Sequence, residues 1–273
     1  RCYITTPLYY VNAAPHIGHA YTTIAADVLA RSKRIRGAEV HLLTGTDEHG
    51  QKIEEASKAA GKSPKEFCDE NSAKFRDLWE RLDIHPDDFI RTTEARHADK
   101  VQELFLTLKE RGDAYKGLYR GWYCVPDETF FSEIDAPPDE KGRRLCPNQE
   151  CRKPLQQIEE ESWFFKLSTY QEPLLKHYRE HPEFLRPAHR AAEILRFVEG
   201  GLQDLSISRQ KVKWGVPVPG DESHTIYVWF DALINYWSAA AGRDDLWPAD
   251  VHIVGKEIFR FHAVIWPAML LAA

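Results

Sequence analysis

Two histidines three positions apart, His16 and His19, lie near the start of this chain. Positions i and i+3 share one side of a helix's first turn, and Pro15 suits the entry to such a helix. Gly18 has no side chain, so a flat ligand could lie against the backbone there. A helix start also offers free N–H groups and a positive dipole end, which bind phosphate. The pattern therefore predicts a nucleoside triphosphate site, in which the histidines stabilise charge on the phosphates.

A second polar group lies in the turn-forming stretch 45–50, directly after a buried strand predicted over 39–44. Strand, helix and strand at this spacing form a βαβ unit, and ligands of open α/β sheets bind beyond the carboxyl ends of the strands. Asp47 could cap the following helix or pair with the ammonium group of an amino acid, and spacing alone leaves both roles open. With His49 and the histidine pair, Asp47 also has the composition of a metal site.

The elements that position these residues follow an alternating α/β pattern. Ile17, Tyr21, Ile24 and Val28 repeat at helical spacing and predict a helix that Gly37 ends. Further helices are predicted over 51–60, 63–82 and a segment ending at 112, and further strands over 2–6, 87–93, 225–230 and 251–254.

The pattern changes near residue 114, where short aromatic strands and then a polar, proline-rich stretch replace the alternation. Helical segments return over 170–178 and 191–197, and the α/β pattern resumes with the strands predicted at 225 and 251. We therefore predict three parts: 1–113 as the first half of an α/β domain, 114–209 as an insertion, and 210–273 as the start of the second half.

The composition is that of an ordinary globular protein of 273 residues, with 43% hydrophobic and 29% charged residues. A net charge of −6 argues against strong nucleic-acid binding by this chain alone, because neutralising phosphates normally needs a basic face. The longest apolar stretch, 263–273, is too short to span a bilayer, and the first residues resemble a strand rather than a signal peptide. Five unevenly spaced cysteines indicate a reducing compartment. We expect a cytoplasmic location without a membrane, with mitochondria and plastids as alternatives.

The His-Ile-Gly-His stretch at 16–19 matches a signature of class I aminoacyl-tRNA synthetases. Four further blocks narrow this resemblance, namely TTPLYYVN at 5–12, TGTDEHG at 44–50, YVWFDA at 227–232 and FHA at 261–263. In this order they resemble the methionyl-tRNA synthetases over 3–271. The resemblance implies a Rossmann-type parallel sheet with an inserted connective-peptide domain. It also implies that methionine and ATP, accompanied by Mg²⁺, form methionyl-adenylate, and that the methionyl group is then transferred to tRNA(Met).

The resemblance also implies which residues bind ATP. His16 and His19 would be the catalytic pair. Glu257 stands where the family has aspartate near the ATP ribose, and its carboxylate reaches one methylene further. The implied ATP-binding residues are His16, Gly18, His19, Gly255, Lys256 and Glu257.

A methionine pocket is implied in the same way. Asp47 would pair with the ammonium group of methionine, and aromatic walls suit a polarizable thioether. By spacing alone, several of these residues form helical stripes that would indicate protein core. The implied methionine-binding residues are Leu8, Tyr10, Asp47, Trp229, Ala232, Leu233, Tyr236, Phe261 and His262.

Three cysteines and one aspartate are weak candidates for a metal site. Many relatives carry paired Cys-x-x-Cys motifs in the connective peptide, whereas Cys124 pairs with Asp127 here and Cys146 is separated from Cys151 by four residues. Because this spacing is loose, we expect a structural zinc to be possible but unlikely.

The second family signature, Lys-Met-Ser-Lys-Ser, does not occur in this sequence. We therefore expect a truncated product or one part of a split enzyme, which would meet tRNA(Met) through the full-length enzyme. The alternative function is a catalytically incomplete fragment that binds methionine and ATP without efficient turnover. A synthetase for leucine, isoleucine or valine would carry a much larger insertion.

Overall fold

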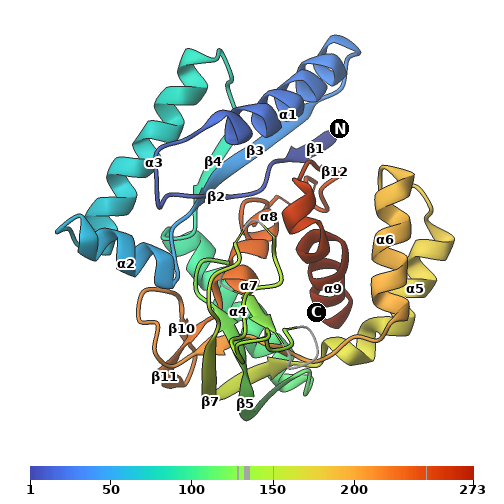
Figure 1. Cartoon of the computed structure of the whole chain (residues 1–273). Helices are drawn as coiled ribbons and strands as arrows, with labels where there is room; N and C mark the ends of the chain where they lie inside the picture. Colours follow the sequence, from blue (N-terminus) through green and yellow to red (C-terminus); the bar gives the residue numbers. More distant parts are fainter. Residues whose placement is uncertain (128, 132–135, 150, 244) are drawn as a thin grey trace.

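The computed structural model describes the chain from 1 to 273 except residues 128, 132–135, 150 and 244 (Figure 1). Its centre is a parallel sheet in which β3 pairs with β1 and β2 on one side and with β4 on the other. The short strand β12 pairs with β1 and extends the sheet. The strands are β1 (Cys2–Thr5), β2 (Tyr9–Tyr10), β3 (Val40–Asp47), β4 (Asp88–Arg91) and β12 (Val251–His252). The predicted α/β fold with a Rossmann-like core is confirmed.

The helices of this first region agree closely with the sequence prediction. Ser63 accepts a hydrogen bond from the backbone of Glu66 and caps α3, and Pro64 occupies the first turn. Phe75 and Trp79 are buried on the inner side of that helix. The helices are α1 (Ile17–Ile35), α2 (Gln51–Ala59), α3 (Pro64–Arg81) and α4 (Ala95–Glu110).

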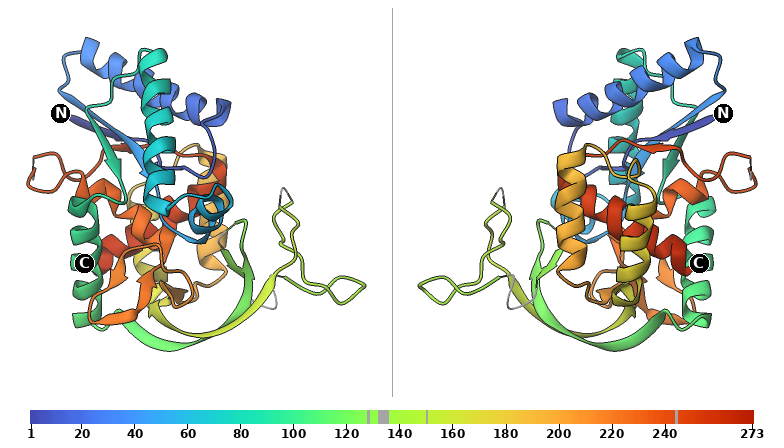
Figure 2. Two further views of the ribbon diagram at one scale, coloured as in Figure 1. Left: turned by 90° about the vertical axis from the view of Figure 1, so that its left-hand side faces the viewer. Right: turned by 90° about the vertical axis from the view of Figure 1, so that its right-hand side faces the viewer.

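From residue 114 the chain forms a separate antiparallel sheet, in which β5 pairs with β6 and β7, and β7 also pairs with β8. Figure 2 shows β5 and β7 as a long curved ribbon below the parallel sheet. Its elements are β5 (Ala114–Cys124), β6 (Thr129–Phe131), β7 (Gln156–Phe165), η1 (Leu167–Tyr170), α5 (Gln171–Glu180), α6 (Ala188–Glu199) and β8 (Leu205–Ser206). The domain boundaries at 113 and 209 stay a prediction, because one hydrophobic core runs from the parallel sheet into this region.

The strand predicted over 225–230 is wrong in its second half. β11 ends at Ile226 and pairs with β9 and β10 in a small antiparallel sheet, not with the parallel sheet. Tyr227 then takes an extended conformation and begins α7. Short apolar runs fit a strand or a buried helix equally well, which explains the error. The remaining elements are β9 (Ser208–Arg209), β10 (Pro217–Val218), β11 (Asp221–Ile226), α7 (Val228–Leu233), α8 (Asn235–Ser238), η2 (Lys256–Ile258), η3 (Phe261–Ile265) and α9 (Trp266–Ala272).

Across the described residues, no helix is both long and apolar enough to cross a membrane.

Candidate active site

The carboxyl ends of the parallel strands place Asp47 at the centre of the predicted site. Asp47 is the last residue of β3, is 2% exposed, and lies opposite Tyr10 of β2 in the sheet register. It does not cap the next helix, because the N-cap of α2 is Gly50. The predicted alternative of a helix cap is therefore wrong, and the pairing of Asp47 with an ammonium group stays a prediction.

His16 and His19 meet as a stacked pair at the start of α1. Their ring centroids lie 3.8 Å apart, with 25° between the planes. Nδ1 of His16 accepts the backbone N–H of Gly18, and Nδ1 of His19 accepts the backbone N–H of His16, both at 3.1 Å. The neutral rings therefore carry their protons on Nε2, where each can donate. Burial and repulsion from His16 lower the pKa of His19 to about 4, so that this ring is neutral near pH 7.

Gly18 leaves room for the His16 ring. A Cβ atom at Gly18 would lie 3.0 Å from that ring, so the ring would have to shift. The predicted contact of Gly18 with ATP stays a prediction.

The strand β2 connects the histidine pair with the aromatic group. Tyr9 contacts the His19 ring at 4.9 Å between centroids, and Phe75 packs on the same ring at 5.1 Å. Tyr10, the next residue, packs edge-on against Trp229 at 5.9 Å. Because successive strand residues point to opposite faces, β2 directs Tyr9 toward the histidine pair and Tyr10 toward Trp229.

Trp229 and Phe261 form the flat wall of the predicted methionine pocket. Their rings stack with centroids 4.1 Å apart and only 14° between the planes. Leu8 lies over Gly45 of β3, where a Cβ would come within 2.8 Å of its side chain. Lys52, which the sequence analysis did not single out, places its Nζ 5.1 Å from the centre of the Tyr10 ring.

Tyr236 and His262 form a buried hydrogen-bonded pair behind this wall. Nδ1 of His262 lies 3.0 Å from the carbonyl oxygen of Ile258, and Nε2 lies 2.6 Å from the Tyr236 hydroxyl. A carbonyl only accepts, so Nδ1 carries the proton and Nε2 accepts from the tyrosine. Burial lowers the pKa of His262 to about 4. Ala232 and Leu233 on α7 are also buried.

The family model described as "tRNA synthetases class I (M)" matches residues 2–273. The chain belongs to this family. It is 56% identical to the methionine–tRNA ligase of Thermotoga maritima and 51% identical to that of Streptomyces coelicolor. The matches cover 100% and 99% of this chain but 44% and 52% of those proteins, so the chain spans about half the length of these relatives.

Solved structures agree with the family assignment. The methionyl-tRNA synthetase of Mycobacterium tuberculosis in complex with methionyl-adenylate has a TM-score of 0.95 at 46% identity. It covers 99% of this chain, which matches 54% of that protein. The apo form of the same synthetase has a TM-score of 0.83 at 44% identity.

The sequence analysis missed a buried carboxylate that joins three elements around the predicted site. Asp231 is fully buried, and its two oxygens lie 2.6 Å from Nδ1 of His49 and 2.7 Å from Nε2 of His97. Nδ1 of His97 lies 2.9 Å from the hydroxyl of Ser238. Burial alone would raise the pKa of Asp231, but the charges and hydrogen bonds of the two histidines outweigh it and lower this pKa to about 2.

The signal for this network was present in the sequence. An acidic residue inside the otherwise apolar run 226–234 has to find a polar partner once it is buried. The network joins the stretch after Asp47, through His49, to the helix α7 that carries Trp229. The Nδ1 atom of His49 is therefore occupied by the Asp231 carboxylate.

The residues predicted to hold the ATP ribose border a cavity of about 370 Å³ beyond β12. Gly255 and Lys256 line it together with Arg186, which precedes α6, and Arg190 in the first turn of α6, so its wall is rich in positive charge. Glu257 lies beside this wall, with its carboxylate 3.6 Å from Nζ of Lys256.

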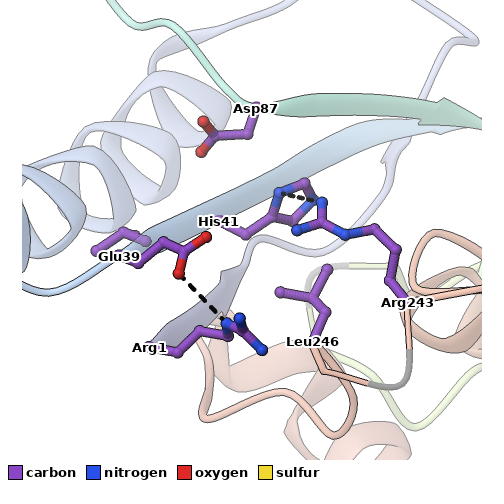
Figure 3. A pocket seen from close by; sticks show the side chains of 7 residues that line it. Arg1, Glu39, His41, Asp87, Arg243 and Leu246 are labelled. Carbon is purple, nitrogen blue, oxygen red and sulfur yellow. Dashed lines mark hydrogen bonds and ion pairs between the residues drawn. The ribbon is translucent and has the colours of Figure 1, made fainter.

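A second cavity of about 370 Å³ lies at the opposite, amino-terminal ends of the strands (Figure 3). Its charges are of both signs and partly paired, as between Arg1 and Glu39 at 3.5 Å. None of the predicted site residues lines it. Its lining residues are Arg1, Glu39, Val40, His41, Asp87, Arg243 and Leu246.

The loose cysteine spacing does not prevent four side chains from converging. The ligand atoms of Cys124, Asp127, Cys146 and Cys151 all lie within 4.8 Å of one another. The Sγ atoms of Cys124 and Cys151 are 3.4 Å apart, and Sγ of Cys146 lies 3.0 Å from a carboxylate oxygen of Asp127. Within the described part of the chain this is the group placed to hold a metal ion, and the predicted histidine–Asp47 alternative does not form one.

Proposed function

We propose that this chain is the amino-acid-activating part of a methionine–tRNA ligase. The observation that carries the proposal is the stacked Trp229–Phe261 wall, with Tyr10 edge-on to it and the buried carboxylate of Asp47 at the end of the neighbouring strand. Such a site suits a ligand with an apolar thioether at one end and an ammonium group at the other. The family membership supports methionine over other amino acids with these features.

The reaction that we assign joins methionine to AMP. A carboxylate oxygen of methionine attacks the α-phosphorus of ATP, the bond to the β-phosphate oxygen breaks, and pyrophosphate leaves with the negative charge. The Nε2–H groups of His16 and His19 would donate to the phosphates as this charge develops. Mg²⁺ would accompany ATP, and the methionyl group would then pass to tRNA(Met).

The remaining site residues would position the substrates. Asp47 would hold the methionine ammonium group, and Gly255, Lys256 and Glu257 would hold the ribose of ATP. Because the two substrates are bound side by side, no covalent intermediate with the enzyme is needed. The residues that would enclose methionine further are Leu8, Ala232, Leu233, Tyr236 and His262. A cytoplasmic location stays a prediction.

The test is ligand-dependent thermal stability of the purified chain with methionine, leucine or isoleucine. A specific ligand stabilises the folded state by RT ln(1 + [L]/Kd), so methionine should raise the melting temperature and the other two should not. Trp229→Ala should abolish the methionine shift. Trp237→Ala is the matched control, because this half-buried tryptophan lies on α8 and packs against Lys100 instead. Equal shifts with all three amino acids would refute the assignment.

We further propose that the cysteine cluster holds one structural zinc ion. Zn²⁺ with ligand bonds of about 2.3 Å to sulfur places its ligand atoms roughly 3 to 4 Å apart. Two pairs in the cluster lie at 3.4 Å and 3.0 Å, and all four ligand atoms lie within 4.8 Å of one another. Burial raises the pKa of the Cys124 thiol to about 11, and a bound metal would reverse this by favouring the thiolate. The ion would brace the ends of β5 and β6 and take no part in the reaction.

Metal analysis of protein purified without chelator should find about one zinc per chain. Cys146→Ser should remove it, whereas Cys68→Ser should not, because Cys68 is a buried thiol outside the cluster. Substoichiometric zinc in the unaltered protein would contradict this proposal and leave the methionine site unaffected.

A further inference from the structure

The stretch between β3 and α2 is held by a tryptophan from a distant part of the chain. This link consists of Glu48, His49 and Gly50, and it directly follows Asp47. Trp214 donates its indole N–H to the carbonyl oxygen of Glu48, and its own carbonyl oxygen accepts the backbone N–H of Gly50 at 3.0 Å. Its ring packs edge-on against the His49 ring, with 5.7 Å between the centroids. One residue therefore contacts all three members of the link.

Glu54 makes this attachment reciprocal. One carboxylate oxygen of Glu54, in the first turn of α2, accepts the backbone N–H of Lys213 at 2.7 Å and that of Trp214. Hydrogen bonds to an ionised carboxylate are roughly twice as strong as those between neutral groups. The N-cap residue of α2 is Gly50, which has a φ of 100° and no side chain to cap the helix. The start of α2 is therefore tied to the segment before β10, which Figure 1 shows next to α2.

The link is buried, so its position is set by these contacts and by packing. Glu48 is fully buried, and His49 is 6% exposed. Both carboxylate oxygens of Glu48 are bound by Arg91, at 2.7 and 2.9 Å. Trp214 itself packs against the apolar cluster that includes Ile53 of α2. Because close-packed interiors transmit a displacement instead of absorbing it, a shift of the link would also move the end of β3.

We propose that Trp214 and Glu54 are positioning residues for Asp47, and that they fix the carboxylate that receives the ammonium group of methionine. This inference rests on the proposed function, because it needs Asp47 to bind that group. A misplacement of about 1 Å can cost on the order of a hundredfold in the effect of a positioned group. Glu48 and Trp214 lie 166 residues apart, so the segment that follows the predicted insertion reaches back to the amino-acid side of the site.

The experiment compares methionine with 4-(methylthio)butanoate, which is methionine without its amino group. The Kd of each ligand is obtained from the melting temperature of the purified chain over a range of ligand concentrations. Trp214→Phe keeps an aromatic ring and removes the indole N–H. Glu54→Ala removes the acceptor of two backbone N–H groups and leaves the tryptophan in place, whereas Glu54→Gln keeps an oxygen that can accept them. Trp122→Phe is the matched control, because this half-buried tryptophan on β5 packs on the cysteine cluster.

We expect Trp214→Phe and Glu54→Ala to weaken the binding of methionine by at least about tenfold, because the carboxylate no longer meets the ammonium group. The binding of 4-(methylthio)butanoate should change by less than about twofold, since this ligand has no ammonium group to misplace. Glu54→Gln should recover most of the lost methionine affinity. Trp122→Phe should leave both affinities unchanged.

Two results would overturn the proposal. An equal loss for both ligands would show that Trp214 acts on the whole pocket, through His49 and α7, and not on Asp47. Unchanged methionine affinity in both variants would show that the link keeps its position without these contacts. If Trp214→Phe does not fold, Glu54→Ala and Glu54→Gln decide the question.

Failure of the proposed function would be recognised earlier, in the unaltered chain. There, equal affinity for methionine and 4-(methylthio)butanoate would show that no carboxylate receives the ammonium group. That result would remove the role of Asp47 and this inference with it. A preference for methionine in the unaltered chain that persists in Trp214→Phe and Glu54→Ala would overturn only the inference.

Discussion

The two sides of the predicted site differ in how completely this chain encloses them. On the amino-acid side, Asp47, Tyr236 and His262 are buried. On the nucleotide side, His16 and Lys256 are exposed. The residues predicted to bind methionine are therefore mostly buried, whereas two of those predicted to bind ATP are open to solvent.

The buried network around Asp231 accounts for this difference. Three elements far apart in sequence, the stretch after β3, α4 and α7, meet at one carboxylate and are fixed there. A fully satisfied polar network of this kind costs desolvation but specifies one arrangement of its neighbours. In the histidine pair, His16 is exposed and His19 is half-buried, and among the described residues the pair is held by α1 and by ring contacts with Tyr9 and Phe75. Changes on the amino-acid side should therefore weaken methionine binding, and changes on the nucleotide side should slow turnover.

The largest expected effect is on turnover by the isolated chain. Methionine-dependent ATP–pyrophosphate exchange should be on the order of a hundredfold slower for each phosphate contact that the open side lacks, at about 3 kcal/mol per contact. Contacts made chiefly in the transition state change turnover more than binding. The Thermotoga maritima ligase, assayed alongside, is the reference. An exchange rate close to the reference would mean that the histidine wall alone is sufficient.

Asp47→Ala should next remove methionine binding while leaving the fold intact. An ammonium group buried without its carboxylate costs roughly 3–5 kcal/mol, by analogy with other broken buried pairs. Calorimetric titration with methionine measures the affinity, and urea denaturation measures the stability of the same variant. Glu257→Ala, a carboxylate on the open side, is the control and should keep methionine affinity. Unchanged affinity in Asp47→Ala would remove this residue from the pocket.

Asp231→Asn should reduce both stability and methionine affinity, because it removes the charge that holds the enclosed side together. The folded pKa of about 2 lies below an ordinary aspartate pKa of about 3.9. The stabilisation is therefore present above about pH 4, and is lost as the pH falls from about 4 toward 2. At pH 7 the substitution should cost on the order of 2–3 kcal/mol of unfolding free energy.

Urea denaturation between pH 7 and pH 3 checks this prediction. The stability difference between the unaltered protein and Asp231→Asn should shrink as the pH falls through 4. Asp99→Asn on the exposed side of α4 should behave like the unaltered protein within about 0.5 kcal/mol. A constant difference at all pH values would show that Asp231 acts through shape and not through charge.

Local signals in the sequence predicted the parts of the fold that local chemistry determines. The capped start of α3, the helix after Pro15 and the strand that becomes β3 all lie where the pattern placed them. Gly45 shows the limit of this reasoning. It was interpreted as the start of a turn, whereas β3 continues through it to Asp47. Glycine is needed there because a Cβ would lie 1.9 Å from the carbonyl oxygen of Ile90. A glycine needed for close approach of two strands resembles a turn glycine in the sequence.

Contacts between distant residues account for most of what the sequence analysis missed. Asp231 lies 182 residues from His49 and 134 residues from His97, and no spacing rule connects them. The side chains of Cys124, Asp127, Cys146 and Cys151 likewise converge although their sequence spacing is loose. The site residues themselves came from a resemblance, and their roles remain predictions that the variants above address.

The smallest expected effect is on stability, and it is measured by substituting one exposed and one buried valine. Val28 lies on the exposed side of α1 and is 60% exposed, whereas Val101 on α4 is fully buried. Val28→Ala in the isolated chain should change the free energy of unfolding by no more than about 0.5 kcal/mol, since exposed positions lose little burial and alanine favours the helix. Val101→Ala should cost roughly 1–3 kcal/mol, because it deletes two buried methyl groups and leaves a cavity. Urea denaturation of both variants gives the comparison. A loss at Val28 as large as that at Val101 would mean that the outer side of α1 is covered in the isolated chain, and the contrast between an enclosed and an open side would then fail.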